Sequence, residues 1–184
     1  MTSAEVNQLL SLPNTSDLKG MRDKAMLELL YATGLKVSEL IGLNVSDVNT
    51  QMGFVRCGEA SSERFIPLYP VAVRALSTYL NKSRKFFVSD SKETALFVNI
   101  NGERMTRQGF WKLLKGYVEE AGITKPITPQ SLRNAFAAHL LENGADIRDI
   151  QEILGHKDPA STQRYAQYLK DKMNKSYMKF HPRA

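Results

Sequence analysis

Four side chains in the C-terminal half of the sequence have types and spacings that could act on a phosphate. Gln130 and Arg133 are three residues apart in a segment that begins Thr128-Pro129, so both side chains can face the same way at a helix N-terminus. A guanidinium beside the free N–H groups of a helix N-terminus can hold a phosphodiester through paired, charge-assisted hydrogen bonds. His156 follows, and Tyr165 lies nine residues after it. A tyrosine near a histidine and an arginine can act as a covalent nucleophile.

Each of these residues also has an ordinary structural interpretation. A lone arginine on a helix is commonly a solvated surface residue, a lone histidine a helix cap or core imidazole, and a lone tyrosine a half-buried aromatic. Taken singly, Arg133, His156 and Tyr165 favour those interpretations. A functional interpretation therefore depends on whether other segments agree with it.

Helical spacing dominates the elements that must position these side chains. We expect helices near residues 3–12, 18–32, 36–43, 71–83, 106–121, 129–142, 147–154 and 161–177, the first with Ser3 as its N-cap. Segments 53–57 and 64–68, joined by a polar loop, predict a β-hairpin, and 95–98 predicts a further short strand. The predicted fold class is mainly α with a small antiparallel β-sheet (α+β), as a single domain over residues 1–184.

Composition narrows the class of protein. The 184 residues carry 25 Lys+Arg against 19 Asp+Glu, and the net charge of +6 favours a polyanionic partner. The single Cys57 cannot form an internal disulfide and the three histidines form no zinc-like cluster, so we expect no structural metal. The sequence has no uninterrupted apolar stretch of spanning length and starts without a signal-peptide layout, so we expect a cytoplasmic protein with no membrane partner.

The sequence as a whole resembles the catalytic domain of the tyrosine recombinases (the phage integrase family), and most closely the Xer-type bacterial recombinases. Collinear stretches over nearly the whole chain carry the resemblance: 22–35, 37–40, 132–133, 136–137, 139–141, 144–146, 154–156 and 181–184. The resemblance implies an integrase catalytic-domain fold that cleaves one DNA strand without metal or cofactor. In that chemistry a tyrosine attacks the phosphodiester, and a DNA 5′-hydroxyl later reverses the 3′-phosphotyrosyl link.

The resemblance also implies a set of site residues, some of which match the family. Arg133, His156 and Tyr165 stand at the positions of the second arginine, the late histidine and the nucleophile. Lys36 stands at the position of the first arginine. A lysine there keeps the positive charge but loses the planar fork that holds two phosphate oxygens at once.

Two further substitutions change charge and proton transfer. Glu59 stands at the position of the hairpin lysine that protonates the leaving oxygen. At about 5 Å and an effective dielectric near 20, its carboxylate would repel a phosphate by roughly 3 kcal/mol. Gln130 stands at the position of the first histidine, and an amide cannot exchange a proton near neutral pH. Loss of one positioned proton-transfer group typically costs about 10²–10⁴-fold in rate.

Three interpretations of function remain open at this point. The first is a site-specific tyrosine recombinase domain whose strand cleavage is impaired by the three substitutions. The alternative is a non-catalytic DNA-binding or accessory module that pairs with an active recombinase. The third is a protein-interaction domain with no role on DNA, which the net charge of +6 disfavours.

Further residues are assigned to DNA by the same resemblance. Arg107 and Lys112 are the expected phosphate contacts, and Arg64 on the predicted hairpin is a further DNA contact that could substitute for the missing hairpin cation. Because arginine holds its proton so tightly, Arg64 would be a poor proton donor. We expect Trp111 to belong to the core and not to stack on a base.

The resemblance also predicts partners. The partner ligand is double-stranded DNA, and segment 170–184 is expected to dock on a neighbouring protomer through Tyr177 and Phe180, giving a homo- or hetero-oligomer on DNA. Packing of the same two side chains on their own protomer is the alternative. A septal DNA translocase is an additional partner that the resemblance allows. The family's N-terminal core-binding domain is expected to be absent from this chain.

Overall fold

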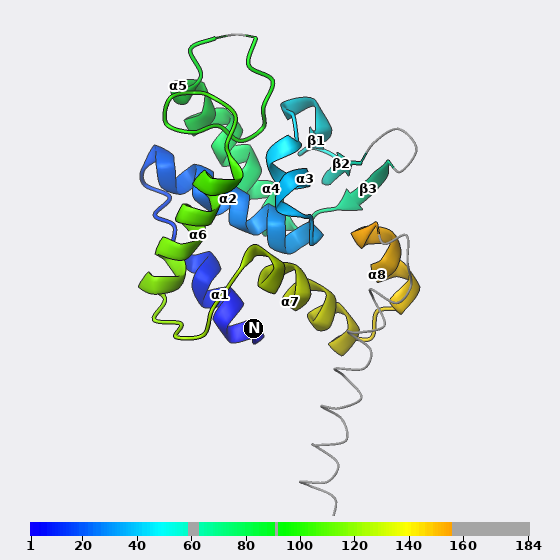
Figure 1. The fold of residues 1–184 in the computed structure, drawn as a ribbon. Coiled ribbons are helices and arrows are strands. Elements are labelled where there is room, and N and C mark those ends of the chain that lie inside the picture. Colours follow the sequence, from blue (N-terminus) through cyan, green and yellow to red (C-terminus); the bar gives the residue numbers. More distant parts are fainter. Residues whose placement is uncertain (59–62, 91, 156–184) are drawn as a thin grey trace, which may run out of the picture.

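A small sheet lies at one side of a helical body in the computed structural model of the chain, which describes residues 1–58, 63–90 and 92–155 (Figure 1). This arrangement confirms the predicted fold class, mainly α with a small antiparallel sheet. The helices are α1 (Ser3–Ser11), α2 (Leu18–Thr33), α3 (Val37–Gly42), α4 (Pro70–Thr78), α5 (Lys85–Phe87), α6 (Arg107–Glu120), α7 (Pro129–Glu142) and α8 (Ile147–Leu154), and the strands are β1 (Val48–Asn49), β2 (Phe54–Cys57) and β3 (Arg64–Pro67).

Helix α2 lies at the centre of the fold and contacts α1, α3, α4 and α7. It begins where the Asp17 side chain accepts a hydrogen bond from the Gly20 N–H at 2.7 Å, and it ends at Gly34, whose φ of 60° is left-handed. Most of its side chains are buried, because neighbours cover it on several sides. The helix therefore also carries buried polar residues, such as Asp23, which accepts from Arg22 at 2.7 Å.

The sheet holds the predicted hairpin and one strand that sequence patterning missed. Strands β2 and β3 pair antiparallel with Val55 opposite Ile66, both buried, and β1 pairs with the other edge of β2. Strand β1 has two residues, too few for any alternation of apolar and polar side chains to be visible in the sequence. Residues 59–62, between β2 and β3 in the sequence, lie outside the described residues.

Three local expectations are wrong. The N-cap of α1 is Thr2 and not Ser3, because Thr2 and Glu5 form a capping box in which each side chain accepts a hydrogen bond from the other residue's N–H. The helix expected over 71–83 ends as α4 at Thr78 and continues as a π-helical turn, Tyr79–Arg84. Segment 95–98 is fully buried but makes only isolated bridges, with Asn44 and Arg104, and forms no strand.

Helices α7 and α8 lie next to each other at the lower right of the described structure in Figure 1. Helix α7 begins at the Thr128 cap, whose hydroxyl accepts from the Ser131 N–H at 3.1 Å, with Pro129 in its first turn. Helix α8 ends at Gly155, which has a φ of 63°. A small apolar cluster joins the two helices, and its buried members are Phe136, Ala137, Ile150 and Leu154. None of the helices in the described ranges combines the length and the apolar character that crossing a membrane requires.

Candidate active site

A hollow of about 390 Å³ where the α2–α3 turn meets α6 and α7 brings together three of the predicted site residues. We call it the Lys36 hollow. It is lined by Leu35, Lys36, Val37, Trp111, Thr128, Pro129, Gln130 and Arg133. The predicted positions of the first arginine, the first histidine and the second arginine therefore border one space, although 97 residues separate Lys36 from Arg133.

Lys36 reaches the hollow from the turn that joins α2 to α3. Its backbone N–H donates to the Glu39 carboxylate at 2.8 Å, which fixes the start of α3, and its side chain is exposed. The preceding Gly34 makes this tight turn feasible because glycine adopts a positive φ without steric cost. An exposed ammonium on a fixed backbone can meet an anion that enters the hollow.

Arg133 is deeply buried, with 2% of its surface exposed. Its guanidinium donates to the Gly34 carbonyl oxygen and, at 2.9 Å, to the Leu154 carbonyl oxygen. The side chain therefore ties α7 to the α2–α3 turn and to the C-terminus of α8. Because an arginine remains protonated at all ordinary pH values, this places a permanent positive charge beneath the hollow.

Gln130 lies in the first turn of α7 and is exposed. Its amide nitrogen donates to the Asn134 side-chain oxygen at 2.8 Å, one helical turn further on. The N-terminus of α7 adds the positive end of a 14-residue helix dipole to the same side of the hollow. The hollow therefore combines a lysine, a buried arginine, an amide and a helix N-terminus, which is a suitable set for binding a phosphate. Among the described residues that line it, none is a histidine, an aspartate or a glutamate.

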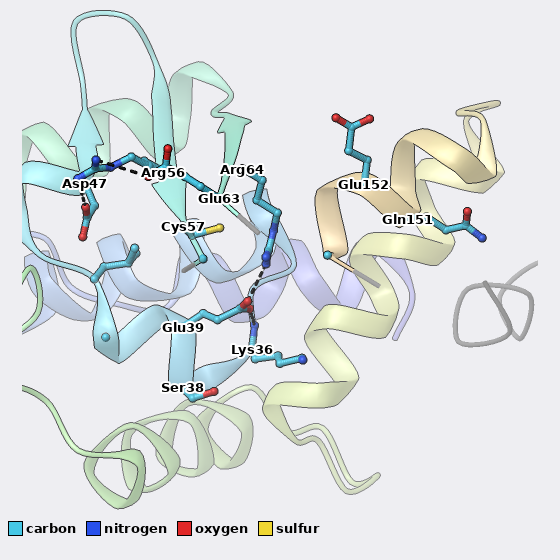
Figure 2. A pocket seen from close by; sticks show the side chains of 14 residues that line it. Lys36, Ser38, Glu39, Asp47, Arg56, Cys57, Glu63, Arg64, Gln151 and Glu152 are labelled. Carbon is cyan, nitrogen blue, oxygen red and sulfur yellow. Dashed lines mark hydrogen bonds and ion pairs between the residues drawn. The ribbon is translucent and has the colours of Figure 1, made fainter. Parts of the chain in front are cut away.

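A larger pocket of about 950 Å³ lies beside the Lys36 hollow and shares Lys36 with it (Figure 2). We call it the hairpin pocket; α3, the β2–β3 hairpin and α8 enclose it. Five of its acidic and basic side chains are paired with one another: Arg56 contacts Asp47 at 2.8 Å and Glu63 at 3.6 Å, and Arg64 contacts Glu39 at 2.8 Å. The charges that line this pocket thus compensate each other in large part.

Arg64 is held inside the protein. Besides its contact with Glu39, its Nε donates to the Ile153 carbonyl oxygen at 2.8 Å, and only 12% of its side chain is exposed. In Figure 2 the guanidinium points from the hairpin toward Glu39. A swing of Arg64 toward the position of the hairpin lysine would break these contacts. The sequence does not predict these contacts, because Arg64, Glu39 and Ile153 are far apart along the chain.

Cys57 lies on the wall of the hairpin pocket and is buried. Burial in apolar surroundings disfavours the thiolate and raises the pKa of this thiol to about 11. The thiolate is the reactive form, so Cys57 is chemically inert near neutral pH.

Helix α6 carries the two predicted DNA contacts and one side chain that was assigned wrongly. Arg107 and Lys112 are both exposed. Trp111 is 44% exposed and lines the Lys36 hollow, so the expectation that it belongs to the core is wrong. The helical period alone indicates this exposure. Phe110 and Leu114 lie on the buried side of α6, and Trp111 is turned by about 100° from Phe110 around the helix.

Three of the predicted site residues, Glu59, His156 and Tyr165, lie outside the described residues, as do the expected helix 161–177 and the segment 170–184. Within residues 1–58, 63–90 and 92–155, no group of three or more His, Cys, Asp or Glu side chains could hold a metal ion.

Comparisons with known proteins place the chain among the recombinases. A family model described as "Phage integrase family" matches residues 1–172. Tyrosine recombinase XerD of Oceanobacillus iheyensis is 52% identical over 186 aligned residues, which cover 100% of this chain and 62% of that protein. The chain therefore spans about three fifths of the length of the curated relatives it matches.

Solved structures agree in fold. The crystal structure of XerA recombinase superimposes with a TM-score of 0.83 at 32% identity, covering 100% of this chain and 66% of that one. XerH site-specific recombinase, bound to a palindromic difH substrate after cleavage, superimposes with a TM-score of 0.82 over 96% of this chain and 51% of that one; at 20% identity this shows the fold alone. Sequence and fold lead to the same assignment: the chain belongs to the phage integrase family, the tyrosine recombinases.

Proposed function

We propose that this chain is the DNA-binding catalytic domain of a site-specific tyrosine recombinase in which strand cleavage is impaired by Lys36, Glu59 and Gln130. The observation that carries the proposal is the Lys36 hollow, where a lysine, an amide and a buried arginine meet at the N-terminus of α7. Close similarity to XerD proteins supports the same activity class. The Tn1549 transposon integrase, which was solved in complex with a circular intermediate DNA and is 25% identical with a TM-score of 0.73, supports DNA as the ligand.

The proposed chemistry begins with a DNA phosphate in the Lys36 hollow. Lys36 and the N-terminus of α7 hold its non-bridging oxygens, and the charge of Arg133 stabilises the developing negative charge. The Tyr165 oxygen attacks phosphorus, the bond to the 5′-oxygen breaks, and a 3′-phosphotyrosyl link forms while the 5′-oxygen takes up a proton. A DNA 5′-hydroxyl reverses these steps.

Proton transfer is the weak step in this scheme. Glu59 replaces the lysine that would protonate the leaving 5′-oxygen, and Gln130 replaces a histidine. Lys36 supplies one point charge where an arginine would grip two oxygens. Each such loss typically costs about 10²-fold or more in rate, although losses within one site do not multiply.

The second candidate function is a non-catalytic DNA-binding module that pairs with an active recombinase. The contacts of Arg64 favour it, because this hairpin cation is held by Glu39 and the Ile153 carbonyl oxygen and would have to break these contacts to move to the place of the missing lysine. In either case we propose that the chain assembles with a second recombinase protomer on DNA through segment 170–184. A septal DNA translocase as an additional partner stays a prediction.

The proposal is tested on a nicked suicide duplex that carries a candidate Xer core site. Fluorescence anisotropy of the labelled duplex measures binding, and a denaturing gel detects a covalent DNA–protein adduct. We expect binding that weakens steeply with added salt, and a slow adduct that vanishes with Tyr165→Phe. Absence of binding at low salt would contradict the DNA role. An adduct that persists in Tyr165→Phe would contradict the assigned nucleophile.

A further inference from the structure

Trp111 is a large aromatic side chain that the packing of α6 does not require to be buried. It is 44% exposed, while Phe110 and Leu114 beside it are fully buried. Its indole borders the Lys36 hollow together with Lys36 and Gln130. An exposed aromatic side chain is common on protein surfaces, so exposure alone is uninformative. Its position in the wall of a charged hollow is what distinguishes it.

The lining of the Lys36 hollow has two chemically different parts. Lys36, Thr128 and Gln130 present polar groups, and a second set of side chains, Leu35, Val37, Trp111 and Pro129, is apolar. At about 390 Å³ the hollow falls within the range of small-ligand sites, roughly 300–1,000 Å³. A nucleotide has the same division, with an anionic phosphate at one end and an apolar face of sugar and base at the other.

The face of α6 that carries Trp111 also carries positive charge. Arg107 precedes Trp111 by four residues and Lys115 follows it by four, so all three lie on one side of the helix. Arg107 is exposed, and Lys115 is exposed beside Glu119 at 3.7 Å. An aromatic side chain between cations is the arrangement that binds a nucleic-acid strand by stacking and by backbone charge.

We propose that Trp111 is a DNA-binding residue whose indole packs against the deoxyribose of the nucleotide next to the phosphate held at Lys36. The inference rests on the proposed DNA-binding function and goes beyond it, because it assigns an apolar contact to a hollow otherwise described by its charges. Packing of this kind depends little on base identity, since every nucleotide of the strand carries the same sugar.

Intrinsic fluorescence tests this contact directly, because Trp111 is the only tryptophan among the 184 residues. A duplex with the candidate core site is titrated into the protein while tryptophan emission and the anisotropy of a DNA end label are recorded together. We expect the emission to change with the same midpoint as the anisotropy. Trp111→Ala should weaken binding by about 5-fold, as expected for the loss of a small apolar contact, and Trp111→Phe by less, because phenylalanine retains an apolar ring.

Phe86→Ala is the matched control, since Phe86 is an exposed aromatic residue (66%) on α5 and lines neither the Lys36 hollow nor the hairpin pocket. Binding with unchanged tryptophan emission would overturn the inference while leaving the proposed function in place. So would a Trp111→Ala variant that binds as tightly as Phe86→Ala. Absence of binding by anisotropy would overturn both. Should Trp111→Ala fail to fold, the emission of the unmodified protein still decides.

Discussion

Lys36 borders both the Lys36 hollow and the hairpin pocket, so its ammonium is the charge most directly placed to meet a DNA phosphate. Lys36→Ala should weaken DNA binding and lower the slope of log affinity against log salt by about 1, because one phosphate contact is lost. Anisotropy titrations at several salt concentrations measure both quantities. Lys85→Ala, which removes an exposed lysine on α5, is the control. Equal slopes for the two variants would contradict the assignment.

Cys57 gives a second prediction at the scale of one residue. Burial raises the pKa of its thiol from 9.0 to about 11, so the folded protein keeps a proton that the unfolded chain loses near pH 9. The free energy of unfolding should therefore fall as the pH rises from about 9 to about 11. At pH 8 iodoacetamide should alkylate Cys57 slowly in the folded protein and rapidly in urea. Rapid labelling of the folded protein would contradict the burial.

At the scale of elements, Arg64 fastens the C-terminus of α8 to α3 and the hairpin. Arg64→Met should lower the free energy of unfolding by about 1 to 3 kcal/mol, since it removes two charge-assisted hydrogen bonds from a largely buried site. It should also speed amide hydrogen exchange in residues 147–155. Arg56→Met, at a 43% exposed ion pair of the same hairpin, should change stability much less than Arg64→Met does. Unaltered exchange in α8 would refute this role.

Gly34 connects the same elements through its backbone. Its φ is 60°, and an added Cβ would approach the Phe136 ring to 2.5 Å and the Leu154 side chain to 2.8 Å. Gly34→Ala should therefore destabilise the fold by about 2 kcal/mol or more. Gly116→Ala on α6 has open space around it and should stabilise by up to about 1 kcal/mol. Urea unfolding measures the free energy of unfolding of both variants. Equal values for the two would contradict the prediction, because they would show that the turn at Gly34 tolerates a side chain.

The sequence predicted elements best where local signals are strong. Helix α7 was predicted with its observed bounds because Thr128 and Pro129 mark its start and its buried residues follow a helical period. The prediction of a strand over 95–98 is wrong, because a short apolar run that is buried on all sides has the same sequence pattern whether or not it pairs with another strand. The prediction that Trp111 belongs to the core is wrong because its apolar character suggests burial, whereas its position lies beside the buried stripe of α6 and not within it.

At the scale of the whole molecule, the sequence predicts which residues belong to the candidate site. It does not predict which of them contact one another. That Lys36, Gln130 and Arg133 border one hollow follows from packing of the α2–α3 turn against α7, over long sequence separations. The engagement of Arg64 with Glu39 and of Arg133 with backbone carbonyls also depends on tertiary contacts. The net charge of +6 agrees with a DNA ligand but does not locate it.

The central claim is that three side chains limit strand cleavage while DNA binding persists. The most direct test compares the unmodified protein with the triple variant Lys36→Arg, Glu59→Lys, Gln130→His in a single-turnover assay on the nicked suicide duplex. Both proteins should bind the duplex, and the triple variant should form the covalent adduct at least about 100-fold faster. Adduct formation at the same rate in both proteins would contradict the claim.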